Sequence, residues 1–340
     1  MTNVKLWSLM HLNKRHLAVL SGFMPHHLDH LAPFACMMRC PLWVDDHEIG
    51  QMVKKYYPGI EVIEKNFDLE EASKIADILV VTTKQGPIEL KSMYQALGNK
   101  YIKIAYLPHG QSDKGLSNPS LRSIQNADIA YIYGALQHQR LEYFGSIKTI
   151  GEIRYTGNFR FDYYQKYTKK LDEITNKEIF SKLDPKRQTL IYAPTWSSDG
   201  FSKYTEELIQ KMNGYNLIIK LHPLIEKKFP AQATYFEKFN ETQPHCVVTS
   251  TFPLVYPILS KIDLYIGDES AMGYDMLAFD KPMYFLTSTV SPLCSCGLRV
   301  DSVQMLREKL TISQNKLTTI RKAFYEKAFM PPKEAEEHEQ

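Results

Sequence analysis

The sequence lacks long hydrophobic runs, contains few cysteines and carries little net charge. No apolar stretch approaches the roughly 20 residues that a membrane-spanning helix needs, and no secretory signal is recognisable at the N-terminus. The five cysteines are odd in number and irregularly spaced, which is typical of reduced thiols in a cytoplasmic protein. The C-x-C at Cys294 and Cys296 has no second cysteine pair, so we expect no metal site.

Other missing features exclude several functions. A net charge of +3, without a dense basic run, argues against a nucleic acid as partner. Neither G-x-G-x-x-G nor G-x-x-x-x-G-K-[ST] is present, which argues against a dinucleotide-dependent dehydrogenase and a P-loop NTPase. The absence of G-x-S-x-G means that a serine hydrolase of that type is not indicated. We expect no bound cofactor.

What the sequence does contain is a repeated alternation of short apolar runs and helical patterns. In the first half, apolar runs at 16–21, 41–44, 61–63, 78–82, 102–107 and 129–133 alternate with helical patterns near 25–37, 47–57, 69–75, 88–97 and 136–144. Strands alternating with helices of about 10–15 residues predict parallel βαβ units in a doubly wound sheet. Residues 151–167 interrupt this alternation.

A second series of the same kind follows. Strands are predicted at 189–193, 217–220, 247–250, 262–266 and 282–286, and helices near 171–182, 204–212, 231–239, 254–259, 272–279, 303–310 and 315–329. A chain of 340 residues that is 44% hydrophobic can bury two cores. The predicted fold class is therefore α/β, with two Rossmann-like domains whose parallel sheets face each other across a cleft. This architecture is called the GT-B type when it belongs to a glycosyltransferase, which the periodicity alone does not indicate. We place the domains at 1–155 and 156–312, followed by a helix and polar tail over 313–340.

Polar residues directly follow several predicted strands. The segments 107–115, 193–197, 220–224 and 267–270 each come after an apolar run, and the segment 157–162 connects the two series. The carboxyl ends of the strands are where an open α/β sheet holds its ligand. The sequence therefore predicts that these segments line a functional cleft, although each segment alone is also ordinary loop sequence.

Two histidines in these segments are candidates for catalysis. His109 is followed by Gly110, which permits a tight turn and close approach of a ligand, and its imidazole can take a proton from an attacking hydroxyl. His222 lies two residues after Lys220, so both side chains fall on one side of an extended chain. An imidazole beside a cation suits a diphosphate leaving group. Each of these residues can equally be a hydrogen-bonded residue at a strand end.

A capped helix start is predicted after the strand at 262–266. Ser270 stands where an N-cap residue belongs, directly after Asp268 and Glu269, and predicts a helix of about ten residues with free N–H groups at its start. Such a start favours an anion such as a phosphate. Asp275 would accept hydrogen bonds from ribose hydroxyls, or it is a solvated helix carboxylate. An ordinary capped helix explains the same pattern.

Two further segments offer ligand contacts. Arg160, with Asn158, would give a bidentate phosphate contact, or it pairs with Asp162. Trp196, after Thr195, is suited to stacking on a base or sugar, although tryptophan more commonly packs in a core.

The ordered set of these residues resembles the CDP-glycerol glycerophosphotransferase family, which includes the teichoic-acid primases and polymerases. The resemblance covers about 101–285 and consists of His109-Gly110 with Lys114, Gly157 with Arg160 and Asp162, Tyr-Ala-Pro-Thr-Trp at 192–196, Leu-His-Pro-Leu at 221–224, Asp268 with Ser270 and Asp275, and Asp-Lys-Pro at 280–282. It implies a GT-B enzyme in which His109 is the general base and His222 a second essential histidine near the donor phosphates. The residues expected on the donor side are Gly110, Asn158, Arg160, Thr195, Trp196, Lys220, Asp268, Glu269, Ser270 and Asp275.

Three positions depart from the family pattern. Gln111-Ser112 stands where the family usually has Thr-Pro, Phe159 where it usually has Pro, and Ala271 where it commonly has a second serine. One hydroxyl is therefore missing at the expected phosphate site. These departures bear on the identity of the donor more than on the fold.

The N-terminal third lies outside the resemblance. Here His26, His27 and Asp29, together with His30, follow the first predicted strand and would face the acceptor, although histidine-rich helix starts also occur without function.

The first residues allow a further reading. Lys14, Arg15 and His16, with Trp7 and Met10, would suit a peripheral contact with an anionic membrane surface, or they are solvated end residues.

Together these observations predict a transferase that takes a CDP- or UDP-linked nucleotide-diphosphate donor and moves glycerol phosphate or a sugar onto a cell-envelope glycan or lipid-linked glycan. A nucleotide-sugar glycosyltransferase or a UDP-sugar 2-epimerase with the same architecture remains an alternative, and so does an inactive GT-B scaffold. We expect a cytoplasmic protein, with peripheral contact to the membrane face as a further expectation.

Overall fold

The computed structural model describes residues 14–83, 86–96, 102–113, 124, 126–195 and 204–332. The chain divides into two compact units: unit 1 comprises Met1–Gln111, Gly115–Lys166 and Glu326–Gln340, and unit 2 comprises Ser112–Lys114 and Tyr167–Tyr325. The change of unit at Lys166 coincides with Tyr167, whose backbone is non-helical inside helix α6 (Phe159–Glu178). The sequence-based domain limits stay a prediction, since compactness alone does not define an independently folding domain.

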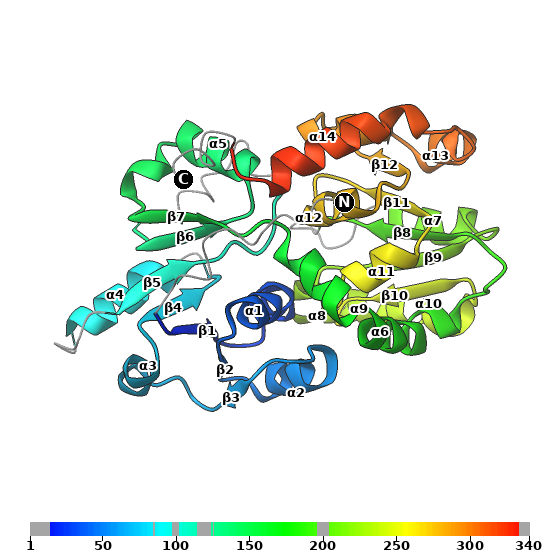
Figure 1. The fold of residues 1–340 in the computed structure, drawn as a ribbon. Helices are drawn as coiled ribbons and strands as arrows, with labels where there is room; N and C mark the ends of the chain where they lie inside the picture. The colour runs from blue at the N-terminus through cyan, green and yellow to red at the C-terminus, as the bar shows by residue number, and fades with distance from the viewer. Residues whose placement is uncertain are drawn as a thin grey trace. The chain divides into compact units, whose positions relative to one another are not determined.

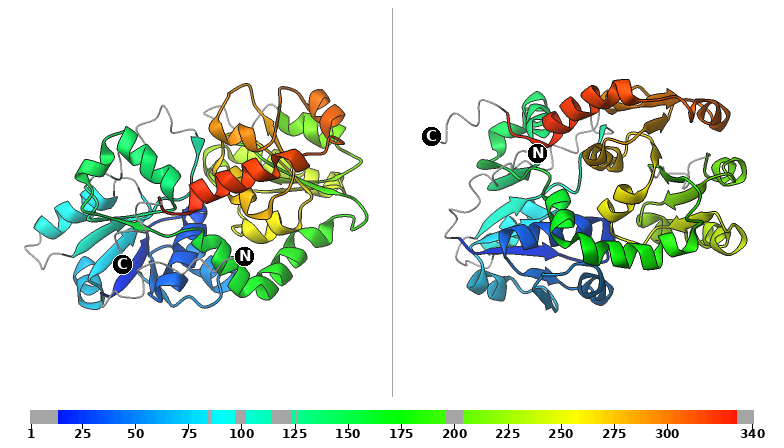
Figure 2. Two further views of the ribbon diagram at one scale, coloured as in Figure 1. Left: turned by 45° about the horizontal axis from the view of Figure 1, so that its top comes forward. Right: turned by 45° about the vertical axis from the view of Figure 1, so that its right-hand side comes forward.

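Unit 1 is built on a parallel sheet (Figures 1 and 2). In its described part the sheet has seven strands in the order β3-β2-β1-β4-β5-β6-β7, and every neighbouring pair is parallel. The strands are β1 (His16–Leu20), β2 (Leu42–Val44), β3 (Val62–Glu64), β4 (Ile78–Val81), β5 (Lys103–Tyr106), β6 (Ile129–Ile132) and β7 (Glu152–Tyr155). The helices are α1 (Pro25–Met38), α2 (His47–Tyr56), α3 (Leu69–Ile75), α4 (Gly86–Ala96), α5 (Ala135–Tyr143) and the first part of α6.

The central strands of unit 1 are apolar because both faces of the sheet are covered. All residues of β1 and β4 are buried, as expected for parallel strands between helices. Leu17 and Leu79 belong to a core cluster with Leu69 of α3 and Leu90 of α4. The starts of α2 and α3 are fixed by aspartate side chains that accept a backbone N–H of the first turn, which satisfies donors that a helix leaves open.

Unit 2 repeats this topology. In its described part the sheet has six strands in the order β10-β9-β8-β11-β12-β13, all parallel. The strands are β8 (Thr189–Ala193), β9 (Asn216–Lys220), β10 (Cys246–Thr249), β11 (Leu264–Gly267), β12 (Met283–Leu286) and β13 (Leu298–Val300). The helices are the rest of α6, α7 (Tyr204–Lys211), α8 (Leu224–Lys228), α9 (Pro230–Glu237), α10 (Phe239–Thr242), α11 (Tyr256–Lys261), α12 (Ala271–Met276), α13 (Val303–Lys309) and α14 (Thr318–Phe329), whose last residues belong to unit 1.

Both sheets reverse their strand order at one place. In unit 1 the chain builds outward from β1 to β3 and then returns to add β4 on the other side of β1, and in unit 2 it does the same around β8 and β11. In doubly wound sheets, ligands bind beyond the carboxyl ends of the strands at this switch point. Each unit therefore has a defined place where functional residues are expected.

The predicted interruption at 151–167 is wrong, because β7 adds a seventh strand there and α6 begins at Phe159. β7 is an edge strand with one exposed and three half-buried residues, so it lacks the apolar run by which buried strands are recognised. The short strand β13 was missed for the same reason, since one of its three residues is exposed.

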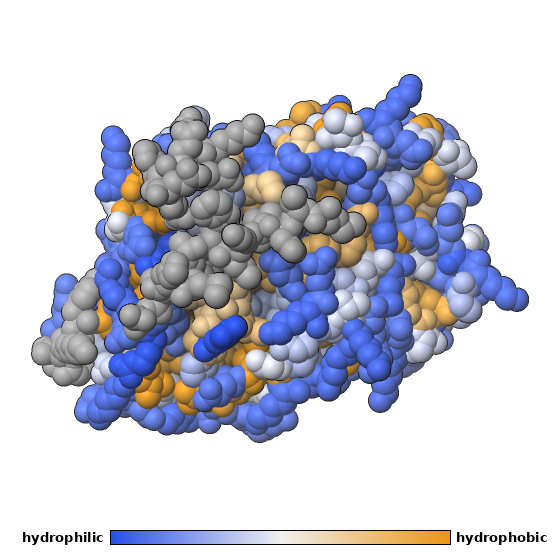
Figure 3. Space-filling view, in the orientation of Figure 1, coloured by the Kyte–Doolittle hydropathy of each residue, from blue (hydrophilic) through white to orange (hydrophobic). Residues whose placement is uncertain are grey.

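On the face drawn in Figure 3, the hydrophobic residues that the structure describes are interspersed with hydrophilic ones. Among the described residues, no helix is both long enough and apolar enough to cross a bilayer. The interpretation of His16 as a surface residue is wrong: it is buried in β1, and its Nε2 lies 2.8 Å from the Tyr131 hydroxyl. Arg15 pairs with Asp77, and residues 7 and 10 lie outside the described residues.

Candidate functional site

Four histidines of unit 1 form a cluster at its switch point. His26, His27 and His30 lie in the first turns of α1, directly after β1, and His109 lies just beyond β5. The rings of His27 and His109 are stacked with centroids 4.1 Å apart and planes inclined by 20°, and His26 packs edge-on against both. His30 packs edge-on against His109 at 6.5 Å. We call these four residues the histidine cluster.

The histidine cluster is held by hydroxyl groups from neighbouring strands. Nδ1 of His27 lies 2.7 Å from the Thr82 hydroxyl, which follows β4 and so ties the two sides of the switch point together. Nδ1 of His30 lies 2.6 Å from the Tyr133 hydroxyl, which follows β6. Gly110, after His109, has φ of 112°, a conformation that residues with a Cβ rarely adopt. The chain therefore needs glycine to present His109 in this way.

The surroundings of His30 favour its neutral imidazole. Burial lowers the pKa of His30 well below its ordinary value, and the positive charges of Arg160 and of neighbouring histidines lower it further. His27 is buried as well, whereas His26 and His109 are partly exposed. At neutral pH His30 therefore adds no positive charge beside the His109 ring.

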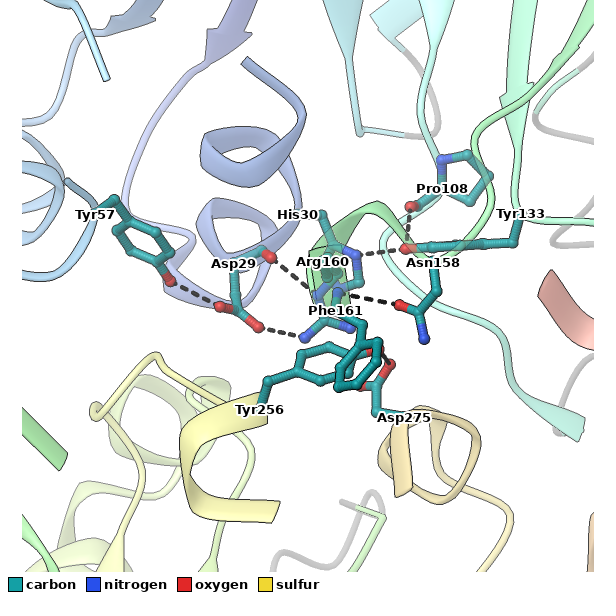
Figure 4. A network of polar contacts seen from close by, with 10 residues as sticks. All are labelled: Asp29, His30, Tyr57, Pro108, Tyr133, Asn158, Arg160, Phe161, Tyr256 and Asp275. Atoms are coloured by element: carbon teal, nitrogen blue, oxygen red, sulfur yellow. Dashed lines mark hydrogen bonds and ion pairs between the residues drawn. The ribbon is translucent and has the colours of Figure 1, made fainter. Parts of the chain in front are cut away.

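Next to the cluster, Asp29 and Arg160 form a buried ion pair (Figure 4). Arg160 donates a hydrogen bond from Nε to the Asp29 carbonyl at 3.0 Å, and the Tyr57 hydroxyl donates to the Asp29 carboxylate at 3.0 Å. Burial raises the pKa of Tyr57, and the charge of Asp29 raises it further. Asp29 is thus a partner that the sequence did not predict for Arg160. Oδ1 of Asn158 accepts the backbone N–H of Phe161 at 3.3 Å in the first turn of α6, so Asn158 serves the helix start that carries Arg160.

In unit 2, the Asp268 side chain connects the carboxyl ends of β8 and β11 at the switch point. Its carboxylate accepts the backbone N–H and the hydroxyl of Thr195, each at 2.7 Å, and the backbone N–H of Ser270 at 3.0 Å. We call residues 268–270 the aspartate turn. These bonds join the ends of two strands that are paired in the sheet, so Asp268 fixes the shape of the turn from within.

Ser270 is the N-cap residue of α12, as predicted, but its side chain makes no capping hydrogen bond. Its hydroxyl instead lies 3.1 Å from the Tyr265 hydroxyl and 3.3 Å from the Ala193 carbonyl. The predicted helix of about ten residues is wrong in length, because α12 ends at Met276 and a 3-10 turn follows. Tyr265 was missed by the sequence interpretation, although the neighbouring glycine gives a signal: a Cβ on Gly267 would overlap the Tyr265 ring.

Lys220 and His222 follow β9 in unit 2. Lys220 is 6% exposed, and its ammonium donates to the Ser250 carbonyl at 3.0 Å. Nδ1 of His222 accepts the backbone N–H of Leu224 at 3.2 Å. A neutral His222 therefore carries its proton on Nε2 and can donate it to an anionic oxygen.

Asp275 and Glu269 complete the unit 2 candidates. The idea that Asp275 is a solvated carboxylate is wrong, because it is 7% exposed and accepts a hydrogen bond from the Tyr256 hydroxyl at 3.0 Å (Figure 4). The backbone carbonyl of Glu269 accepts the Ser112 hydroxyl at 2.9 Å. Ser112 thus supports the aspartate turn at a position where the sequence departs from the family pattern.

Two structural contacts of unit 2 could not be read from the sequence. Buried Asp113 accepts hydrogen bonds from the Tyr274 hydroxyl and the Leu293 backbone. In the Asp-Lys-Pro motif, Lys281 donates to the backbone carbonyls of residues 259, 260 and 262 at the end of α11. The neighbouring Asp280 forms an ion pair with Arg321. This motif therefore holds helix ends together.

Two residues of the sequence pattern, Lys114 and Trp196, lie outside the described residues. In the part of the chain that the structure describes, no group of three or more His, Cys, Asp or Glu side chains is arranged to hold a metal ion. Unit 1 brings together His26, His27, His30 and His109 beside the Asp29–Arg160 pair, and unit 2 brings together Thr195, Asp268 and Ser270.

Comparison with protein-family models gives a match to the family described as CDP-glycerol:poly(glycerophosphate) glycerophosphotransferase, over residues 62–291. Comparison with curated protein sequences gave no match.

Comparison with solved structures gives matches that cover nearly the whole chain. The wall teichoic acid polymerase TagF is 15% identical with a TM-score of 0.61, over 95% of this chain and 87% of that one. S. aureus MnaA in a structure with UDP is 15% identical with a TM-score of 0.61, over 91% of each chain. UDP-GlcNAc 2-epimerase from Neisseria meningitidis bound to UDP-GlcNAc is 12% identical with a TM-score of 0.56, over 93% and 94%. These matches confirm the predicted fold class, the GT-B type.

Proposed function

Because the chain belongs to the CDP-glycerol:poly(glycerophosphate) glycerophosphotransferase family, we propose that it transfers glycerol phosphate from CDP-glycerol to a hydroxyl of a cell-envelope glycan or lipid-linked glycan. The observation that carries the proposal is the extent of the family match. It spans residues 62–291 and so includes His109 as well as His222 and the whole aspartate turn. The chain is accordingly an enzyme of GT-B type.

In the proposed reaction, an acceptor hydroxyl attacks the β-phosphorus of CDP-glycerol. A new P–O bond forms to the acceptor oxygen, the bond between the β-phosphorus and the bridging oxygen breaks, and CMP leaves with the bonding electron pair. The hydroxyl proton passes to His109 acting as general base. The stacked ring of His27 and the Gly110 backbone conformation support this role, because they hold the imidazole at a partly exposed position.

On the donor side, we assign nucleotide binding to the switch point of unit 2. His222 would donate from Nε2 to a phosphate oxygen, and Lys220 would add positive charge as the leaving phosphate gains negative charge. Thr195, Asp268 and Ser270, with Glu269 and Asp275, would shape the pocket for the nucleoside. The hydrogen bonds of Asp268 support a shaping role, since its carboxylate already accepts three donors from the protein.

The other members of the donor set have more indirect roles in this proposal. Arg160 and Asn158 would act through the first turn of α6, because Arg160 is engaged by buried Asp29. Trp196 remains a candidate for stacking on the cytosine. On the acceptor side, we propose His26 and His27, with Asp29 as the residue that fixes the helix carrying them. The cytoplasmic location and a peripheral contact with the membrane remain part of the proposal.

One alternative has a specific observation in its favour. Matched structures that contain UDP or UDP-GlcNAc cover 91% and 93% of this chain, so a nucleotide-sugar glycosyltransferase or UDP-sugar 2-epimerase is the second candidate. An epimerase would interconvert UDP-sugars with no acceptor present, whereas the proposed transferase would leave them unchanged.

Calorimetric titration with CDP, CMP, UDP and GDP tests the donor assignment. We expect binding of the cytidine nucleotides, and binding of UDP alone would favour the alternative. Titration of wild type, His109→Ala and His222→Ala separates the two histidines. His109→Ala should leave CDP affinity unchanged and abolish donor turnover, whereas His222→Ala should weaken both. No binding of any nucleotide to the folded wild-type protein would refute the proposal and favour a scaffold.

A further inference from the structure

The Tyr133 hydroxyl connects the histidine cluster to the backbone that carries His109. It lies 2.6 Å from Nδ1 of His30 and donates a hydrogen bond to the Pro108 carbonyl at 3.3 Å. Pro108 directly precedes His109 in the chain. Figure 4 shows the hydroxyl between the His30 ring and this carbonyl. One buried hydroxyl thus bridges a helix of the cluster and the loop of the proposed base.

The two contacts of the Tyr133 hydroxyl favour one tautomer of His30. A phenol has a single proton to donate, and a carbonyl oxygen can only accept. The Tyr133 hydroxyl can direct its proton to the Pro108 carbonyl and accept from a protonated Nδ1 of His30, or direct it to an unprotonated Nδ1 and leave the contact with the carbonyl unmade. Only the first arrangement gives both partners a hydrogen bond, and it leaves the neutral ring with an acceptor at Nε2. This tautomer is compatible with the burial of His30, which is 5% exposed, because a buried imidazole favours the uncharged form.

The Tyr133 ring is itself fixed by aromatic neighbours. It stacks on Phe159 with planes inclined by 12° and packs edge-on against Phe329 of α14. Phe159 is buried and forms an aromatic platform under Tyr133. The backbone N–H of Tyr133 also donates to the Gln137 side chain at 2.9 Å. The ring therefore has little freedom, and its hydroxyl can act as a fixed point.

We propose that Tyr133 is a positioning residue for the transfer reaction: its hydroxyl holds the Pro108–His109 backbone and the Nδ1–H tautomer of His30, and so keeps the His109 imidazole in its reactive orientation. In this role Tyr133 acts through His30 and the Pro108 carbonyl, which its hydroxyl contacts. This inference rests on the proposed function in so far as it names His109 as the base. A base displaced by a fraction of an ångström can still accept a proton. It is less often within hydrogen-bond reach of an acceptor hydroxyl that is aligned for attack on the phosphorus.

The test uses Tyr133→Phe, which keeps the ring contacts and removes only the hydroxyl. Tyr131→Phe is the matched control, because Tyr131 is also a buried residue, stands two positions before Tyr133 and has its hydroxyl 2.8 Å from a histidine, His16, that lies outside the cluster. We expect Tyr133→Phe to lower kcat with CDP-glycerol by about tenfold or more while CDP affinity stays unchanged. Tyr131→Phe should retain wild-type kcat. Equal kcat values for the two variants, after thermal denaturation has shown both to be folded, would overturn the inference.

Two additional readouts keep the result independent of folding and of the proposed reaction. His30→Asn retains a donor at the place of Nδ1, so it should be more active than His30→Leu, and equal loss in both would contradict the positioning role.

In ¹⁵N NMR of histidine-labelled protein, wild type should show His30 as the Nδ1–H tautomer and Tyr133→Phe should not. An Nε2–H tautomer in wild type would refute the inference even if CDP-glycerol proves not to be the donor. The reverse outcome, an Nδ1–H tautomer without any transfer, would refute only the proposed function.

Discussion

Replacing Asp268 with asparagine should weaken nucleotide binding as well as the fold. Oδ2 of Asp268 accepts the Thr195 backbone N–H, and Oδ1 accepts both the Thr195 hydroxyl and the Ser270 N–H. If the asparagine oxygen takes the place of Oδ1, the bonds from the Thr195 hydroxyl and the Ser270 N–H are kept. The asparagine NH₂ group then faces the Thr195 backbone N–H. One charge-assisted bond is lost and two donors oppose each other.

The magnitude follows from these contacts. A hydrogen bond to a charged group contributes about 1.5–3 kcal/mol, and an unsatisfied buried donor costs about 1–3 kcal/mol. Because Asp268 is only partly buried, we expect Asp268→Asn to lower the free energy of unfolding by about 2–3 kcal/mol. The turn opens at the proposed nucleotide site, so CDP affinity should fall at least about tenfold, which corresponds to about 1.4 kcal/mol.

Asp263→Asn provides the control at the opposite end of the same two strands. Asp263 precedes β11, and its carboxylate accepts the Thr189 N–H at the start of β8 at 2.7 Å. Urea denaturation should show both variants destabilised with unchanged m-values, and calorimetry should show that only Asp268→Asn binds CDP more weakly. Equal CDP affinity in the two variants would refute the placement of the nucleotide at the carboxyl ends of β8 and β11.

Three further predictions concern the fold around the site. Gly267→Ala places a Cβ against the Tyr265 ring and should lower the free energy of unfolding by about 1–3 kcal/mol, measured by urea denaturation; wild-type stability would show that the ring can move aside. Arg160→Met leaves the buried Asp29 charge without its guanidinium and should cost about 3–5 kcal/mol, whereas adding Asp29→Asn should restore part of this loss; additive losses would contradict a coupled pair. Burial lowers the pKa of His16 to about 4. Between about pH 6.5 and pH 4 the unfolded chain therefore binds a proton that the folded chain does not. As the pH falls through this range, the free energy of unfolding should drop by up to about 1.4 kcal/mol per pH unit. His16→Gln should flatten that pH dependence in urea denaturation, and an unchanged slope would count against the buried neutral imidazole.

The alternation of buried strands and amphipathic helices was readable from the sequence because parallel strands between two helical layers are apolar on both faces. β1, β4, β8 and β9 are buried throughout and were predicted within a residue or two. The edge strand β7 and the first turns of α6 were not, because they mix exposed and buried residues and give no clear period.

For the site, the sequence identified residue types at strand ends but not their partners. His27 with Thr82 and Arg160 with Asp29 are 55 and 131 positions apart, and nothing local encodes such pairs. The sequence also could not distinguish Ser270 as a helix cap from Ser270 as a partner of the Tyr265 hydroxyl, since an N-cap serine has the same neighbours in either case. Tertiary packing decided between the two.

The proposal depends on which bond of the donor is broken, and one labelling experiment measures this directly. Wild-type protein is incubated with CDP-glycerol labelled with ³²P at the β-phosphorus, with and without a glycerol-phosphate-primed acceptor. Cleavage between the two phosphates predicts that the label enters the acceptor and that unlabelled CMP is released in equal amount. Release of labelled CDP, or label that stays out of the acceptor while glycerol enters it, would contradict glycerophosphate transfer.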